Sequence, residues 1–121
     1  MDADEILPLT RETVTRLLES RRSSEGSPEL AKREVPRWAF PGAVELWVPK
    51  RGAEVHTLGV CQNLGERGVG VRCDEALKVG TTLPVAIHQP EASLHGKGIV
   101  RHCTPRGSGF LVGIEFIFDA G

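Results

Sequence analysis

The amino-acid sequence predicts an all-β core, a small antiparallel β-barrel of six strands, preceded by one α-helix. Several short segments alternate apolar and polar residues or are rich in β-branched residues, and glycine-bearing turns separate them at regular intervals. Only one stretch repeats its apolar residues at helical spacing, and it precedes all of the strands. This order disfavours parallel βαβ units, and closure into a barrel would leave no unpaired strand edges.

The predicted helix lies within Thr10 to Arg22. Its apolar residues recur at helical spacing, at Val14, Leu17 and Leu18, and Pro8 and Thr10 supply start signals. We expect the helix to pack on the barrel, and the sequence leaves open a homodimer in which it pairs with a second copy. Its apolar face is too short to favour binding at a membrane surface.

The next segment, Ser23 to Ala31, is rich in Ser, Gly, Pro and Glu and shows no periodicity. This composition predicts a flexible linker. The chain therefore divides into an N-terminal segment with the helix at residues 1–22, the linker at 23–31 and the barrel domain at 32–121.

The barrel domain opens on two arginines, Arg33 and Arg37, with Lys32 beside them. Pro36 pushes Val35 into an extended conformation, so we interpret residues 32–37 as an extended loop. The two arginine α-carbons are then up to about 13 Å apart. Because residues four apart lie on one side of an extended segment, both arginines would face the same partner.

The predicted strands follow this loop. Alternation and β-branched composition place them at residues 44–48, 55–62, 69–71, 83–87, 98–101 and 110–118. Lys50 to Ala53 would close the first hairpin, and Pro84 would sit near a strand start or edge.

A polar, glycine-rich turn, Asn63-Leu64-Gly65-Glu66-Arg67-Gly68, lies between the second and third of these strands. An arginine can bond a phosphate with two donors, reach O6 and N7 of guanine, or stack on a base. Asn63 offers a donor and an acceptor, while Gly65 and Gly68 let backbone approach a ligand. Together with the arginine loop, the turn predicts a site for a small anionic ligand with purine edges. The alternative is a plain β-turn beside a solvated basic loop.

Composition excludes several function classes. The chain has 121 residues, 40% of them hydrophobic and 26% charged, as in ordinary globular domains. The net charge of -1 argues against a DNA- or RNA-coating protein, which normally needs a basic surface. Arg67, Arg72 and Arg101 could extend a phosphate-binding face, although plain surface charge is favoured. No apolar run approaches the roughly 18 residues that span a bilayer, so we expect no membrane insertion and a cytoplasmic location.

The cysteines and histidines do not predict a metal site. Cys61, Cys73 and Cys103 are odd in number and lack a CxxC spacing, so we expect buried, reduced thiols. The four histidines show no ligand spacing either. No nucleophile or carboxylate pair stands out, and we expect neither an enzyme nor a bound cofactor.

The chain resembles the PilZ family, bacterial receptors for the second messenger cyclic diguanylate (cyclic di-GMP). Members carry RxxxR before the barrel, matched by Arg33 and Arg37, and [DN]xSxxG at an early turn, matched at its ends by Asn63 and Gly68. The likeness extends through residues 98–101 and 112–116 and covers roughly residues 32–118. It implies that the arginines grip guanine edges and phosphates, that Asn63 bonds a guanine or holds the turn, and that Gly68 provides clearance.

Two features depart from the family. Gly65 stands where members carry a serine or a similar small residue, and the missing hydroxyl would cost about 0.5–1.5 kcal/mol, or roughly two- to tenfold in affinity. The sequence ends at Gly121, soon after the last predicted strand, where such barrels often continue into a helix. We expect the N-terminal helix to cover that barrel mouth instead.

The leading hypothesis is a cyclic di-GMP receptor whose arginine loop folds over the ligand and changes the surface shown to a protein partner. The main alternative is a PilZ-like adaptor that works through protein contacts, in motility or pilus assembly, without binding nucleotide. Both arginines favour the receptor, and Gly65 favours the adaptor. The sequence identifies neither the partner nor the oligomeric state.

Overall fold

A computed structural model describes residues 6–24 and 42–118 of the protein. In chain order the elements are β1 (Ile6–Pro8), α1 (Arg11–Ser24), β2 (Ala43–Lys50), β3 (Ala53–Leu64), β4 (Gly68–Cys73), β5 (Thr82–His88), β6 (Ser93–Arg106) and β7 (Gly109–Ile117). The predicted helix and the six predicted strands are all present.

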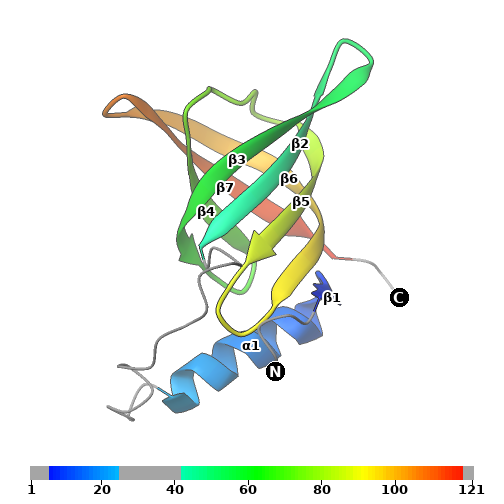
Figure 1. Ribbon diagram of the computed structural model, residues 1–121, viewed down its shortest axis with the longest axis vertical. Coiled ribbons are helices and arrows are strands. Elements are labelled where there is room, and N and C mark those ends of the chain that lie inside the picture. The colour runs from blue at the N-terminus through cyan, green and yellow to red at the C-terminus, as the bar shows by residue number, and fades with distance from the viewer. Residues whose placement is uncertain (1–5, 25–41, 119–121) are drawn as a thin grey trace.

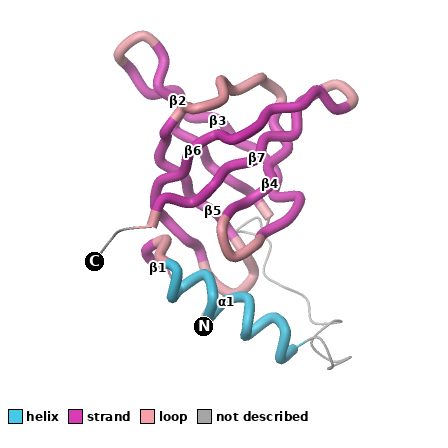
Figure 2. The backbone as a smooth tube through the Cα atoms, turned by 180° about the vertical axis from the view of Figure 1, so that it is seen from behind, coloured by secondary structure: helices cyan, strands magenta, loops and turns pink. Residues whose placement is uncertain are grey.

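Strands β2 to β7 form one closed antiparallel barrel (Figures 1 and 2). The sheet runs β1-β6-β5-β2-β3-β4-β7, and an additional β6–β7 pairing closes it. Each of the six barrel strands therefore has a neighbour on both sides. This confirms the predicted six-stranded barrel, and closure satisfies the backbone groups that an open sheet would leave at its edges.

The apolar residues of alternate positions fill the barrel. On β2, Val44, Leu46 and Val48 are buried while the residues between them are partly exposed. Because side chains of a strand alternate between its faces, this pattern directs the apolar set inward. The core continues through similar residues on the other strands, including Val71, Leu83, Val85, Ile87, Leu94, Val100 and Val112.

The first hairpin closes as predicted, with Lys50 paired to Ala53. The two residues between them both have positive φ, 48° at Arg51 and 81° at Gly52. Positive φ at both central residues is the geometry of a type I′ turn, whose twist matches that of paired strands.

Helix α1 lies across one end of the barrel, the end at which β2, β4 and β6 begin (Figures 1 and 2). Its start is capped reciprocally, since Thr13 N–H donates to Thr10 Oγ1 at 3.1 Å and Thr10 N–H donates to Thr13 Oγ1 at 3.0 Å. Val14 and Leu17 are fully buried in the core. The helix therefore covers a barrel mouth, as expected, and extends to Ser24, two residues into the predicted linker.

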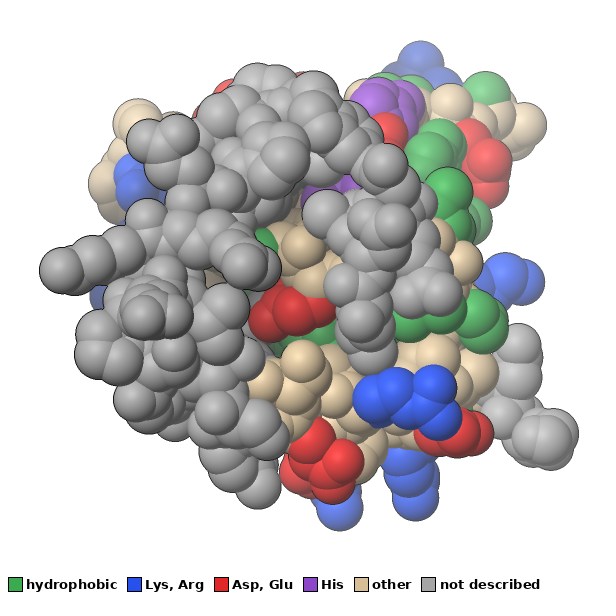
Figure 3. Space-filling model, turned by 60° about the horizontal axis from the view of Figure 1, so that its bottom comes forward, with side chains coloured by type: hydrophobic (Ala, Val, Ile, Leu, Met, Phe, Trp, Pro, Cys, Tyr) green, Lys and Arg blue, Asp and Glu red, His purple; other side chains and the backbone are tan. Residues whose placement is uncertain are grey.

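The outward side of α1 is charged. Glu12, Arg16 and Glu19 are exposed, and Arg16 pairs with Glu12 at 2.7 Å. From this end of the molecule, acidic and basic side chains lie close together on the surface (Figure 3). Among the described residues, no helix has the length and apolarity needed to cross a bilayer.

Strand β1 was not predicted. It pairs in parallel with β6, from Ile6 opposite Ser93 to Pro8 opposite His95. Leu9 continues the contact by donating its N–H to His95 O at 2.6 Å, and its buried side chain covers Gly96. Three residues are too few for a periodicity, so this pairing left no signal in the sequence.

The three cysteines form no disulfide, and only Cys73 is fully buried. Burial raises the pKa of the Cys73 thiol to about 11, so it stays protonated and unreactive at neutral pH. Cys61 and Cys103 are half-buried, which corrects the expectation of three buried thiols. Trp47 lies on the outer face of β2, with its ring centroid 5.3 Å from that of His56.

Candidate functional site

The predicted polar turn joins β3 to β4 at the barrel end that α1 covers (Figure 1). Gly65 N–H donates to Gly68 O at 2.9 Å and closes the turn. Phe116 N–H donates to Arg67 O at 2.8 Å and ties the turn to β7. These two hydrogen bonds hold the backbone of the turn in place through contacts within the protein alone.

Asn63 is exposed and lies at an irregularity in the β3–β4 pairing, where the register shifts between Cys61 and Asn63. Its Oδ1 accepts a hydrogen bond from Gly70 N–H at 3.2 Å. A Cβ on Gly70 would come within 2.8 Å of that oxygen, so the side chain lies directly over the glycine. Within the described residues its Nδ2 has no hydrogen-bond acceptor, which leaves an amide donor available at the surface.

The two glycines of the motif differ in their surroundings. A Cβ on Gly68 would overlap the Ile114 carbonyl oxygen, so Gly68 permits the close approach of β4 to β7. A Cβ on Gly65 would meet only Gly68 O, at 3.8 Å, and Gly65 does not have positive φ. A side chain therefore fits at position 65 without strain.

A shallow groove of about 320 Å³ adjoins this turn and crosses β4, β7 and β6. It is lined by Asn63, Arg67, Gly68, Val69, Arg101, His102, Gly113, Ile114 and Glu115. The Arg101 guanidinium donates through Nε to Glu115 Oε1 at 2.6 Å, and the His102 imidazole covers Gly113. The groove thus combines two guanidinium groups, one of them paired with the Glu115 carboxylate, with an amide donor and an imidazole ring on one open surface.

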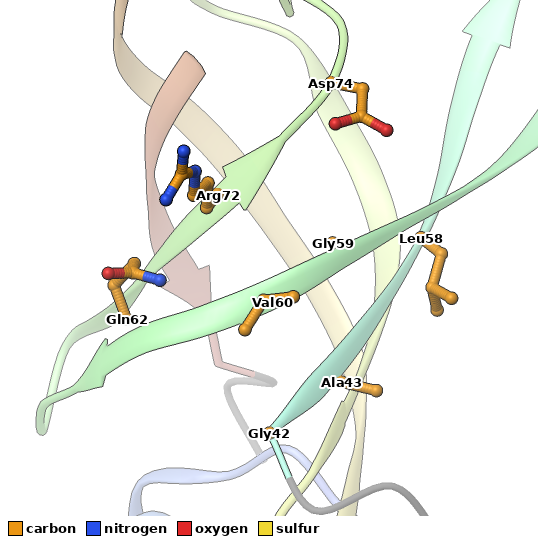
Figure 4. Close-up of a pocket in the computed structure, with 8 residues that line it drawn as sticks. All are labelled: Gly42, Ala43, Leu58, Gly59, Val60, Gln62, Arg72 and Asp74. Atoms are coloured by element: carbon orange, nitrogen blue, oxygen red, sulfur yellow. The ribbon is translucent and has the colours of Figure 1, made fainter. Parts of the chain in front are cut away.

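A second groove of about 680 Å³ lies further along β3 on the outside of the barrel. It is lined by Gly42, Ala43, Leu58, Gly59, Val60, Gln62, Arg72 and Asp74. In Figure 4, Gly42 lies at one end of this groove and Asp74 at the other. Its lining is mostly apolar, in contrast to the first groove.

Gly42 fixes the point at which the preceding segment joins the barrel. Its N–H donates to His88 O at 2.7 Å, and its carbonyl accepts from Cys61 N–H at 2.6 Å. Its φ of 100° favours glycine. Arg37 is five residues earlier, so its α-carbon lies within about 18 Å of Gly42.

The basic residues of the predicted site, Lys32, Arg33 and Arg37, lie outside the described residues. Asn63 near the end of β3, Gly65 in the turn and Gly68 at the start of β4 lie close together, and Asn63 and Gly68 line the first groove. Of the three arginines considered from the sequence as an extension of a phosphate-binding face, Arg67 and Arg101 line the first groove, where the β4–β7–β6 pairing brings them together. Arg72 lines the second groove instead.

Glu45 lies at the centre of a polar network that the sequence did not reveal. Its Oε2 bonds His88 Nε2 at 2.6 Å, and its Oε1 bonds His56 Nε2 at 2.9 Å. His88 Nδ1 in turn bonds Ser93 Oγ at 2.7 Å. The hydrogen bond from His88, followed by that from His56, lowers the pKa of the Glu45 carboxyl below its ordinary value of 4.5, although partial burial opposes the shift.

We expect the Glu45→Gln variant to be less stable than the wild type by about 1 kcal/mol at about pH 6, where the carboxylate is charged. Because the folded-state pKa is lowered, this contribution is complete above pH 4.5 and disappears as the pH falls through the folded-state value. Urea unfolding of both proteins at about pH 6 and about pH 3 measures the difference. Glu75→Gln, at an exposed pair with Lys50, is the control and should change little; an equal loss at both pH values in Glu45→Gln would contradict the expectation.

No group of three or more His, Cys, Asp or Glu side chains among the described residues is arranged to hold a metal ion.

A family model described as the PilZ domain matches residues 31–120, which include both predicted motifs. No curated protein and no solved structure matches the chain.

Proposed function

Because the chain belongs to the PilZ domain family, we propose that it is a non-enzymatic receptor for cyclic di-GMP. The observation that carries the proposal is the family match across residues 31–120, which includes Arg33, Arg37 and the turn from Asn63 to Gly68. The exposed Asn63 amide and Gly68 line an open groove beside two further arginines. Cyclic di-GMP has two phosphates and two guanines, and these groups match that set of donors.

Each side chain has a distinct role in this proposal. Arg33 and Arg37 bind phosphate oxygens or the O6 and N7 edge of guanine, with Lys32 adding charge. The Asn63 amide donates to a guanine acceptor, while its oxygen stays bonded to Gly70. Arg67 supplies positive charge from the groove, while the charge of Arg101 is offset by its ion pair with Glu115 in the same lining.

The output is proposed to be a change in surface rather than a reaction. Residues 25–41, the arginine-bearing segment that contains Arg33 and Arg37, connect α1 to the barrel at Gly42. Ordering of that segment on the ligand would alter what the α1 end of the molecule presents to a protein partner.

One observation favours the second candidate, an adaptor that acts through protein contacts without nucleotide. Gly65 lacks the hydroxyl that the family motif provides, and one hydrogen bond of this kind is worth about 0.5–1.5 kcal/mol. That loss corresponds to roughly two- to tenfold in affinity, which weakens a receptor without abolishing binding. The receptor is therefore preferred.

Calorimetric titration of the purified full chain with cyclic di-GMP tests the proposal, with cyclic diadenylate as the control. Micromolar or tighter binding of the guanine ligand alone supports the receptor. If the protein is shown by circular dichroism to be folded and gives no heat at high ligand concentration, the adaptor takes its place.

We expect Gly65→Ser to raise the affinity for cyclic di-GMP by roughly two- to tenfold, because the new hydroxyl can donate to the ligand. The open space and the unstrained backbone at position 65 should leave stability nearly unchanged. The same titration measures the gain. Gly65→Ala adds the Cβ without the hydroxyl, so an equal gain in both variants would attribute the effect to backbone stiffening instead.

A further inference from the structure

The second groove presents apolar side chains on the outer face of the barrel, where a strand ordinarily carries polar residues. Leu58 is 62% exposed and Val60 is 55% exposed, and both point away from the core. Val60 pairs with Ala43 on β2 and with Arg72 on β4, so the apolar surface covers β2 and β3 and is bordered by the Arg72 side chain on β4. A hollow of about 680 Å³ lined in this way is suited to apolar or aromatic side chains.

The position of Gly42 identifies a candidate occupant. Gly42 forms one end of the groove, and the chain that leads into it carries Phe40 two residues earlier and Trp38 four residues earlier. Their α-carbons therefore lie within about 7 Å and about 14 Å of Gly42, which keeps both rings within reach of the groove. Because the tether is so short, the effective concentration of these rings at the groove is far higher than that of any separate molecule.

The charges at the edge of the groove suit an aromatic occupant. Arg72 is exposed and lies beside Val60 in the β3–β4 pairing. Its guanidinium group can form a cation–π contact with the face of an aromatic ring that binds in the groove.

We propose that this groove is the docking site for the aromatic side chains of Trp38 and Phe40 from the same chain. Docking would hold Arg37, the residue before Trp38, against the outside of the barrel. The inference concerns the protein without nucleotide, and it stands or fails independently of cyclic di-GMP binding.

NMR of the full chain without nucleotide tests the proposal. We expect nuclear Overhauser contacts from the Trp38 and Phe40 rings to the methyl groups of Leu58 and Val60, with Trp47→Phe used to assign the Trp38 signals. Val60→Ser should remove these contacts and move the Trp38 signals toward those of free tryptophan. Val79→Ser is the matched control, since Val79 is 56% exposed in the β4–β5 connection and outside the groove; it should leave the Trp38 signals unchanged.

Three results would overturn the docking. The first is the absence of ring-to-methyl contacts in a protein whose barrel signals are dispersed. The second is a Trp38 signal that responds equally to Val60→Ser and Val79→Ser. The third is contacts that appear only between differently labelled molecules in a mixed sample, which would assign the groove to a second copy of the chain.

Discussion

Alanine at Arg33 or at Arg37 is expected to lower the affinity for cyclic di-GMP by about 100-fold or more. Each guanidinium is proposed to make two charge-assisted hydrogen bonds to phosphate or guanine, and each such bond is worth about 1.5–3 kcal/mol. Loss of about 3 kcal/mol corresponds to roughly 100-fold in the dissociation constant. Titration calorimetry of each variant, at an ionic strength matched to that of the wild type, measures the change.

A matched control separates this effect from a general loss of positive charge. Arg106 is exposed at the end of β6, at the opposite end of the barrel from α1. Arg106→Ala removes the same charge and should change affinity by less than about twofold, as expected for a distant, screened charge. A similar loss in Arg106→Ala and Arg37→Ala would point to non-specific attraction of an anion. It would count against specific binding of the ligand by Arg33 and Arg37.

The fold could be predicted from the sequence because its signals are local. Alternation at Val44, Leu46 and Val48 identifies the inward face of β2, and Gly52 supplies a residue suited to one of the two positive-φ positions of a two-residue hairpin turn. Val14 and Leu17 likewise mark the helix face that is buried. Such patterns fix which segments are strands and which residues face the core.

The features that the sequence did not reveal depend on contacts between distant residues. Glu45 meets His88 only because β2 pairs with β5, 43 positions away in the chain. Strand β1 exists because β6 offers a partner, and its three residues carry no pattern of their own.

The candidate site could be predicted in part, because some of its signals are also local in the sequence. Asn63, Gly65 and Gly68 are close in sequence, so their grouping in one turn followed from spacing alone. Gly68 shows the limit of such an argument. Its motif suggests clearance for a ligand, while the structure shows clearance for the Ile114 carbonyl of β7. A Gly68 variant would therefore combine a packing defect with any effect on binding, and Gly65 is the better position for tests of the motif.

Leu17→Ala is expected to destabilise the whole protein by about 2–5 kcal/mol, because a fully buried leucine would leave a cavity between α1 and the barrel end. The helix contributes to the barrel core, since Leu17 and Val14 belong to the same buried cluster as Leu46 and Val85. Urea unfolding followed by circular dichroism measures the free energy of unfolding, and a single transition is expected if helix and barrel unfold together.

Leu18→Ala is the matched control, since the adjacent leucine is only half-buried and its loss should cost less than half as much. Equal small effects of the two substitutions would mean that the helix is detached from the barrel mouth in solution. A large cost at Leu17 alone would make α1 a fixed part of the domain. Any signal from the arginine-bearing segment would then have to act on a helix that is held by the core, which favours a change in the surface around α1 over release of the helix itself.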